Sequence, residues 1–304
     1  MTGSALPSVS IVVPVRNGER TITACVDALC AQDYRGPYDL VVVDNGSTDA
    51  TASRGAALGV PLVREARQGR GIARNTGIGV TDGEILAFVD SDCIAEPRWL
   101  TELVRPYADP DVAGVGGEIH AVPPVSAVQI YLDRRESCWQ QYCVQGGRRK
   151  RAGFLITANA SYRRSVLDLV GGFDPHFVTS EDVDLGYRVR RAGYRLAYAG
   201  DAIVRHQLRE TMRELFRQRY GYGYGRALMR RRHDLERGYS LPKRREVADS
   251  AVTACRLTAR SLRESAIAAD ASYARCETVE RLAVRLGATH AAVARHVPRL
   301  RLLA

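Results

Sequence analysis

Three kinds of pattern are missing from this chain of 304 residues. Its seven cysteines form no C-x-x-C pair and no zinc-ligand spacing, and an odd number without a secretory leader predicts reduced thiols in a cytoplasmic protein. No window reaches the roughly 18 uncharged apolar residues of a membrane span. The turn after the first predicted strand lacks the G-x-G-x-x-G loop of dinucleotide-binding proteins, which argues against an NAD enzyme.

The composition is that of a folded chain with an excess of positive charge. Hydrophobic residues make up 45% of the sequence, which is enough to bury a core. The formal net charge is +10, and most of the excess is arginine. This charge predicts an anionic partner, which can be a nucleotide, a phosphate, a membrane surface or a nucleic acid. The length fits one large domain, or one domain with a smaller appendage.

Strand and helix patterns alternate over the first ninety residues. Short apolar runs predict strands at Val9–Val15, Asp39–Val43, Pro61–Val63 and Glu84–Val89. Between these strands, apolar residues recur with helical spacing and predict helices at residues 21–31, from Ser47 or Thr48 to residue 58, and at residues 69–78. Such alternation is typical of a doubly wound α/β fold with a mostly parallel sheet.

The second half of the chain predicts a mixed lobe followed by basic helices. Between residues 97 and 206 we expect helices at 97–107, 164–170 and 181–191, and strands at 112–119, 154–157, 194–198 and 202–205. Residues 238–242 are expected to form a linker, and residues 247–297 amphipathic helices. Three glycines in Tyr220–Gly225 each disfavour a helix by about 1 kcal/mol, which predicts a kink or a mobile loop there.

Two carboxylates follow the strand predicted at Glu84–Val89. Asp90 and Asp92 are one residue apart, so in an extended chain both point to one side, into the crevice beyond the strand ends. Two hard oxygen ligands there suit Mg²⁺ or Mn²⁺ carrying a substrate diphosphate. In the structural alternative, Asp92 caps a helix from Glu96 and Asp90 is a turn residue.

Other polar residues near predicted strand ends also allow two interpretations. Asp44 can contact a bound base or ribose, or it can belong to a turn. Arg70 and Arg74 lie one helical turn apart and can reach a diphosphate, or they can be solvated surface arginines. His206 ends a strand and can be a third metal ligand or a structural histidine.

The acidic pair Glu181–Asp182 opens a predicted helix. Acidic residues are favoured in a first helical turn by the helix dipole alone. The functional alternative is a general base, already ionised near neutrality, that takes a proton from an acceptor hydroxyl.

Seven motifs, in order along residues 8–206, make the chain similar to the family 2 glycosyltransferases of GT-A fold. They are S-I-V-V-P-V-R-N-G-E from Ser10, V-V-D-N-G-S-T-D from Val42, G-I-A-R-N from Gly71, V-D-S-D from Val89, G-G-F-D from Gly171, E-D-V-D-L from Glu181, and His206. The resemblance implies a domain at 1–206, with a Rossmann-like nucleotide half at 8–118 and an acceptor half at 119–206. A basic helical extension at 207–304 would follow.

The resemblance also implies an activity and a set of roles. The enzyme would move a sugar from a nucleotide-diphosphate sugar to an acceptor hydroxyl, with inversion and with Mn²⁺ or Mg²⁺. The donor would be bound by Pro14, Val15, Glu19, Asp44, Arg70, Arg74, Asp90 and Ser91. The metal would be held by Asp92, with Asp90 and His206. Asp182 would be the base with Glu181 beside it, and Asn159 and the Gly171–Asp174 loop would edge the acceptor side.

Two other classes of protein remain open at this point. One is a non-catalytic protein of the same fold that binds a sugar nucleotide or a polyanion. The other is a membrane-surface protein whose basic helices dock on anionic lipid, at the inner membrane face. The arginine-rich stretch near Tyr220–Gly225 also fits a lid, an anionic acceptor contact or a solvated face. No nucleic-acid partner is expected, because no such binding fold is recognised.

Overall fold

The computed structural model describes residues 6–136, 139–145, 153–233 and 270–293. Their contacts form two compact units that alternate along the chain. The first comprises Met1–Val122, Ser137–His176 and Glu181–Gln207, and the second Pro123–Glu136, Phe177–Ser180 and Leu208–Ala304. The linker predicted at 238–242 and residues 247–269 and 294–297 of the predicted amphipathic stretch lie outside the described residues. The domain boundary at residue 206 stays a prediction.

Within the described ranges, the first unit contains one mixed sheet of eight strands in the order β3-β2-β1-β4-β7-β6-β8-β5. The first four strands are parallel, as predicted, while β7 runs antiparallel to β4 and β6. The strands are β1 (Val9–Val15), β2 (Tyr38–Asp44), β3 (Leu62–Arg64), β4 (Ile85–Val89), β5 (Cys93–Ala95), β6 (Val112–Ala121), β7 (Asn159–Arg163) and β8 (Arg195–His206).

Helices cover both faces of this sheet. They are α1 (Ile22–Cys30), α2 (Thr51–Ala56), α3 (Arg70–Gly79), α4 (Trp99–Val104) with the 3-10 helix η1 (Arg105–Ala108), α6 (Trp139–Val144), α7 (Arg164–Val170) and α8 (Glu181–Arg191). Ile11 and Val13 of β1 pack with α1 and α4, whereas Val12 packs on the opposite face with α3, α7 and α8. Central strands that are buried on both faces consist of continuous runs of Val and Ile, and such runs allowed these strands to be predicted from the sequence.

Several predictions in the later half of the first unit are wrong. Residues 154–157 do not form a strand, and the strand in this region is β7, which begins at Asn159. The short strand β5 was not predicted. The two strands predicted at 194–198 and 202–205 are one strand, β8, whose pairing with β6 shifts register between Gly117 and Glu118. Their irregular pairing interrupts the alternation of apolar residues on which the predictions relied.

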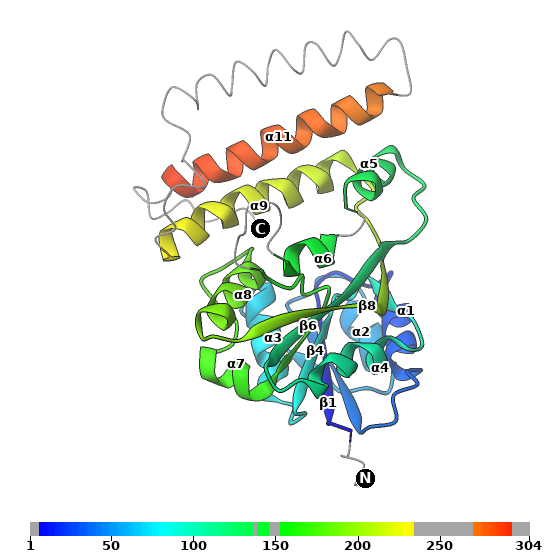
Figure 1. Ribbon diagram of the computed structural model, residues 1–304. Coiled ribbons are helices and arrows are strands. Elements are labelled where there is room, and N and C mark those ends of the chain that lie inside the picture. The colour runs from blue at the N-terminus through cyan, green and yellow to red at the C-terminus, as the bar shows by residue number, and fades with distance from the viewer. Residues whose placement is uncertain (1–5, 137–138, 146–152, 234–269, 294–304) are drawn as a thin grey trace. The chain divides into compact units, whose positions relative to one another are not determined.

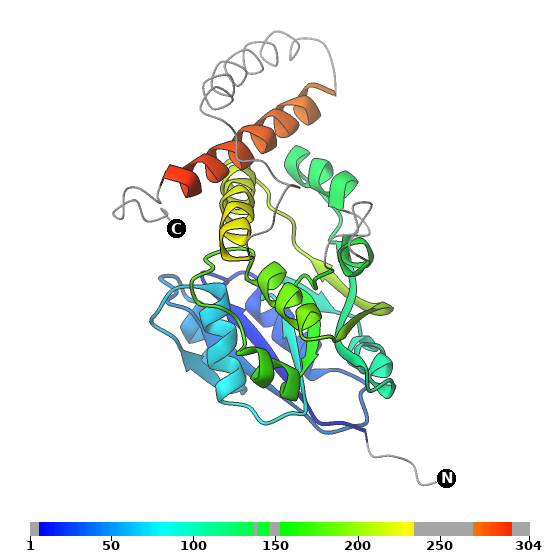
Figure 2. The ribbon, with the colours of Figure 1, turned by 60° about the vertical axis from the view of Figure 1, so that its left-hand side comes forward.

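The second unit contains α5 (Ala127–Glu136), α9 (Met212–His233) and α11 (Asp270–Val293). Helices α9 and α11 pack against each other (Figures 1 and 2). The predicted loop at Tyr220–Gly225 is wrong, since α9 is continuous through all three glycines. Helix packing explains this, because a Cβ at Gly223 would overlap the carbonyl oxygen of Val284. Among the described residues, no helix has the length and apolarity needed to cross a bilayer.

Replacing Gly223 with alanine is expected to destabilise the second unit by about 1–3 kcal/mol, as overpacking does elsewhere. Helix propensity alone predicts the opposite sign, because alanine favours a helix over glycine by about 1 kcal/mol. Gly221→Ala is the matched control in the same helix, since its Cβ would lie 3.8 Å from Thr179 in ordinary contact. Urea unfolding followed by circular dichroism compares the two. Equal stability of both variants would contradict the packing role of Gly223.

Candidate active site at the carboxyl ends of the central strands

The central parallel strands end together at the point where the strand order reverses. β1 lies between β2 and β4, and Val15 pairs with Asp44 at the ends of β1 and β2. Open α/β sheets bind ligands in the crevice outside the carboxyl ends of strands at such a switch point. Most of the predicted donor and metal residues lie at the ends of these three strands or in the segments that directly follow β1 and β4.

The two carboxylates after β4 lie on a tight turn. The N–H of Cys93 donates to the carbonyl oxygen of Asp90 over 2.9 Å, and β5 begins directly after Asp92. The expectation that both side chains point the same way along an extended chain is therefore wrong. The alternative in which Asp92 caps a helix is wrong as well, although Asp90 is a turn residue. The turn directs Asp90 toward α3 and Asp92 toward the end of β8.

Arg74 of α3 joins Asp90 to the start of α8. One terminal nitrogen of its guanidinium lies 2.8 Å from Asp90 Oδ1, and the other lies 2.7 Å from Glu181 Oε1. The side chain of Arg74 is only 1% exposed, so the solvated-arginine alternative is wrong for this residue. Burial opposes its charge, but the carboxylates of Asp90 and Glu181 outweigh burial and raise the pKa of Arg74. Two motifs more than a hundred residues apart in the sequence thus meet.

We expect Arg74→Met to lower the free energy of unfolding by about 3–5 kcal/mol, because it leaves the buried carboxylate of Glu181 without its cation. In the double variant Arg74→Met, Glu181→Gln, the buried charge is gone, so the loss should be smaller than the sum of the two single losses. Urea titrations of the four proteins in this cycle measure the coupling. Strict additivity would contradict a direct interaction between the two side chains.

Asn75 holds the loop that precedes α8. Its Nδ2 donates to the carbonyl oxygen of Phe173 over 2.7 Å, and its Oδ1 accepts from the N–H of Phe173 over 2.9 Å. The guanidinium of Arg74 lies over the ring of Phe173, 5.6 Å from its centroid. Sequence analysis gave Asn75 no role. Its only signal was its place in the G-I-A-R-N motif, directly after Arg74.

Asp182 is a half-buried carboxylate in the first turn of α8. Burial, and then the neighbouring charge of Glu181, raise its pKa to about 7, against the opposing charges of Arg74 and Arg70. With this pKa the carboxyl is only partly ionised at neutral pH, whereas the sequence analysis expected a base already ionised there. Glu181 is paired with Arg74, whereas Asp182 Oδ1 accepts only from the N–H of its neighbour Val183 in the contacts of the described residues. Of the two acids, Asp182 is the one suited to exchange a proton near neutral pH.

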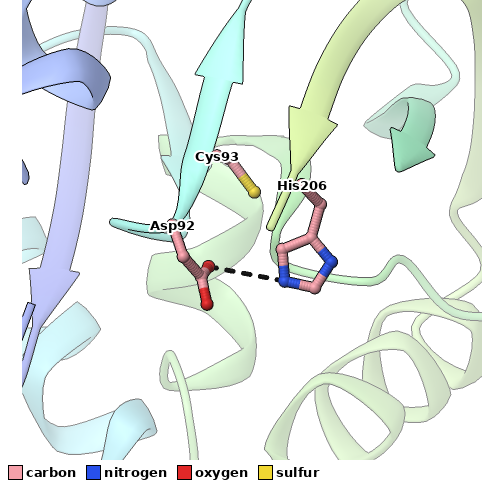
Figure 3. Close-up of side chains that lie close together, drawn as sticks. All are labelled: Asp92, Cys93 and His206. Carbon is pink, nitrogen blue, oxygen red and sulfur yellow. Dashed lines mark ion pairs between the residues drawn. The ribbon is translucent and has the colours of Figure 1, made fainter. Parts of the chain in front are cut away.

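Asp92 and His206 come together through the pairing of β5 with β8. His206 lies opposite Cys93 in the antiparallel register, and its Nε2 is 3.4 Å from Asp92 Oδ1 (Figure 3). Among the described residues, the possible ligand atoms of Asp92, Cys93 and His206 form one group, all within 4.8 Å of one another. Asp90, also predicted as a metal ligand, is outside this group and faces Arg74.

Asp44 and Asn45 end β2 in a buried turn. Oδ1 of Asp44 accepts from the N–H of Ser47 over 3.0 Å, which is the turn contact of the structural alternative. Asn45 donates to the carbonyl oxygen of Arg67 over 2.8 Å and accepts from the N–H of Gly69 over 2.8 Å. Asn45 therefore ties β2 to the loop before α3. Asp44, only 4% exposed, is the carboxylate at the end of this strand.

Glu19 helps to join the loops that follow β1 and β2. Its Oε2 accepts from the N–H of Ala50 over 3.0 Å, and its own N–H donates to Asp49 Oδ2 over 3.3 Å. In the same way, Asn17 Oδ1 accepts from the N–H of Thr48 over 2.8 Å. The family resemblance implied only a nucleotide contact for Glu19. The structure adds that its carboxylate orders the two loops at the crevice.

The other predicted donor residues lie near the same strand ends. Pro14 and Ser91 are half-buried, Val15 is buried, and Arg70 is exposed at the start of α3. The carbonyl oxygen of Val15 accepts from the N–H of Asn45 over 2.8 Å.

Asn159 does not line an accessible surface. Its side chain is fully buried, with Oδ1 accepting from Trp99 Nε1 over 2.7 Å. Its Nδ2 donates to the carbonyl oxygens of Glu118 and Ala202 over 2.8 Å each. The expectation that Asn159 edges the acceptor side is therefore wrong. A fully buried amide with these internal partners stabilises the junction of β6, β7 and β8 instead.

The fold is shared with solved sugar transferases. The mannosyltransferase PcManGT from Pyrobaculum calidifontis, solved with GDP-Man and Mn²⁺, superposes with a TM-score of 0.65 at 21% identity, covering 95% of this chain and 88% of that one. Glucosyl-3-phosphoglycerate synthase from Mycobacterium tuberculosis, solved with Mn²⁺, UDP-glucose and glycerol 3-phosphate, has a TM-score of 0.53 at 23% identity, covering 76% and 82%. The predicted GT-A fold class is thereby confirmed.

Sequence relatives identify the family. Residues 7–225 match the family model described as glycosyltransferase like family 2. Glycosyltransferase AglE of Haloferax volcanii is 32% identical over 229 residues, 73% of this chain and 74% of the relative. The O-antigen chain rhamnosyltransferase RfbN of Salmonella typhimurium is 27% identical over 231 residues, 70% of both. The chain belongs to glycosyltransferase family 2, and it is an enzyme that transfers a sugar from a nucleotide sugar.

Another relative is longer than this chain. The pre-mycofactocin glycosyltransferase of Mycobacterium tuberculosis is 30% identical over 245 residues, which make up 76% of this chain but 49% of the relative. The chain therefore spans about half the length of that protein.

Proposed function

We propose that this protein is a metal-dependent inverting glycosyltransferase in which Asp182 is the general base. The observation that carries the proposal is the bridge through Arg74, which places the acidic start of α8 beside the turn after β4. The diphosphate-binding and proton-accepting functions of such an enzyme need to act on the same sugar, on opposite sides of its anomeric carbon. A single active carboxylate that activates the acceptor hydroxyl for in-line attack inverts the configuration at that carbon.

The leaving group of the reaction would be a nucleoside diphosphate. Such a group needs charge neutralisation more than protonation, and a divalent ion supplies this as a Lewis acid. The donor set supports a cation site, since Asp92 and His206 present an oxygen and a nitrogen 3.4 Å apart. Both solved neighbours were obtained with Mn²⁺. We assign Asp92 and His206 as ligands for Mn²⁺ or Mg²⁺, with Asp90 beside the diphosphate.

The donor would occupy the crevice at the ends of β1 and β2. Asp44 is placed to accept from the base or ribose, with Pro14, Val15 and Glu19 beside it, while Ser91 and Arg70 would lie by the diphosphate and sugar. GDP-Man and UDP-glucose in the solved neighbours support a nucleotide-diphosphate sugar as the donor class. Because Arg74 is buried between two carboxylates, we assign it as a positioning residue for Asp90 and Glu181.

The pKa of Asp182 predicts how the rate depends on pH. With this pKa raised to about 7, the carboxyl is protonated below neutrality and cannot accept the proton of the acceptor hydroxyl. We expect kcat/KM to rise with pH, with the midpoint of the rise near pH 7 and the plateau about one pH unit higher. Glu181→Gln removes a neighbouring negative charge, so it should lower the pKa of Asp182 and move the rise to lower pH. If the rise of kcat/KM stays at the same pH in Glu181→Gln, the group that titrates is not Asp182.

A panel of nucleotide sugars, with and without Mn²⁺, tests the proposed function. A ligand that binds only the folded protein raises its melting temperature, so one sugar nucleotide should stabilise the protein in a metal-dependent way. The same compound should release nucleoside diphosphate when an acceptor is added. Stabilisation by a sugar nucleotide that is the same with and without Mn²⁺ would contradict the metal-dependent part of the proposal. The acceptor, the cytoplasmic location and a peripheral membrane contact stay predictions.

A further inference from the structure

We propose that Cys93 is a third ligand of the metal centre and makes it selective for thiophilic divalent ions such as Zn²⁺, Cd²⁺ and Co²⁺. The inference rests on the proposed function in one respect, the metal centre at Asp92 and His206. It adds a ligand of different chemistry, because a thiolate is a soft donor whereas Mg²⁺ and Mn²⁺ suit oxygen donors.

The sheet register brings the thiol to the centre. Cys93 and His206 are directly opposite each other in the antiparallel pair of β5 and β8. Directly paired residues project from the same face of a sheet, so their side chains are neighbours. Asp92 directly precedes β5, and the carbonyl oxygen of Asp92 accepts from the N–H of Gln207 over 2.9 Å. This hydrogen bond extends the pairing of β5 and β8 by one residue beyond His206. Figure 3 shows the sulfur directed toward the space between the carboxylate and the imidazole.

The dimensions of the group suit one small ion after a modest adjustment. The three donor atoms lie within 4.8 Å of one another. Ligands at the usual zinc distances of about 2.0–2.3 Å in a tetrahedron lie roughly 3.3–3.8 Å apart. The side chains of Asp92 and His206 are 17% and 15% exposed, and Cys93 is fully buried. An ion would thus reach Asp92 and His206 from solvent and meet the sulfur on its inner side.

Binding through the thiol exchanges a proton for a metal bond. The S–H bond breaks, its proton passes to the buffer, and a sulfur–metal bond forms without a change of oxidation state. Among first-row divalent ions Mn²⁺ stands at the weak end of the affinity order, while Co²⁺ and Zn²⁺ stand higher. We therefore expect Zn²⁺ to displace Mn²⁺ from the wild-type protein.

Cobalt substitution tests the ligand directly. Titrating the full chain with Co²⁺ should produce a near-ultraviolet thiolate-to-cobalt charge-transfer band, and Cys93→Ser should abolish it. Cys25→Ser is the matched control, since Cys25 is also fully buried and lies near this turn, 3.7 Å from the carbonyl oxygen of Asp90. Loss of a direct ligand should weaken Zn²⁺ binding by more than the roughly 10- to 100-fold cost of losing a supporting group. Mn²⁺ binding should change little.

The outcomes separate this inference from the proposed function. Mn²⁺ binding that depends on Asp92, together with no charge-transfer band, would overturn the role of Cys93 and leave the proposed metal centre standing. A band that persists in Cys93→Ser would overturn it too. Failure of the wild-type protein to bind either ion would overturn both. ¹¹³Cd NMR of the wild-type protein reports a sulfur ligand without any substitution, so a poorly folding variant does not prevent a decision.

Discussion

Asp182→Asn is expected to lower kcat by roughly 10²- to 10⁴-fold, the usual contribution of a general base. Asparagine has nearly the same size, and its side-chain oxygen can still accept from the N–H of Val183, as Asp182 does over 2.8 Å. The substitution therefore removes the proton acceptor and little else. Metal-dependent stabilisation by the donor should persist, because the diphosphate and metal would be held by residues after β4 and at the end of β8.

The measurement is nucleoside diphosphate release at saturating donor, about one pH unit above the pKa of Asp182, where most of the wild-type base is ionised. Asp168→Asn is the control, since Asp168 is an exposed aspartate on the neighbouring helix α7 and should leave turnover unchanged. The pH dependence of any residual activity should lose its rise near neutrality. Full turnover by Asp182→Asn would remove this residue from the mechanism.

Asp92→Asn is expected to abolish the dependence of turnover on metal. A metal acting as a Lewis acid contributes several kcal/mol to the transition state. At 1.36 kcal/mol for each factor of ten, that corresponds to a loss of at least about 100-fold in kcat/KM. A neutral amide is a poorer ligand than a carboxylate, and it also removes the partner of His206 Nε2 at 3.4 Å.

Isothermal titration with Mn²⁺ and turnover over a range of Mn²⁺ concentrations measure this loss together. Asp82→Asn, at an exposed position before β4, controls for a general effect of removing negative charge. Asp92→Asn and Asp182→Asn should differ in kind, because only the first should lose metal-dependent binding of the donor. Wild-type Mn²⁺ affinity in Asp92→Asn would contradict its assignment as a ligand.

The predictions failed where pairing and packing override local patterns. Asp90 and Asp92 looked like neighbours on an extended strand, but the bond from Cys93 to Asp90 turns the chain and separates their directions. The glycines of α9 looked like helix breakers, but close packing against α11 needs a residue without a side chain at Gly223. In both cases the deciding partner is a hydrogen bond or a backbone that the local sequence pattern does not reveal.

The sequence by itself determined the parallel half of the sheet and the motifs at its strand ends. Strands buried on both faces must be apolar throughout, and the polar residues that follow them stand out by contrast. Only the tertiary structure decided which motifs meet. Arg74 pairs with Glu181 because α3 and α8 pack on the same face of the sheet. His206 reaches Asp92 because β8 pairs antiparallel with β5, and such long-range contacts follow from the register of strands far apart in the chain.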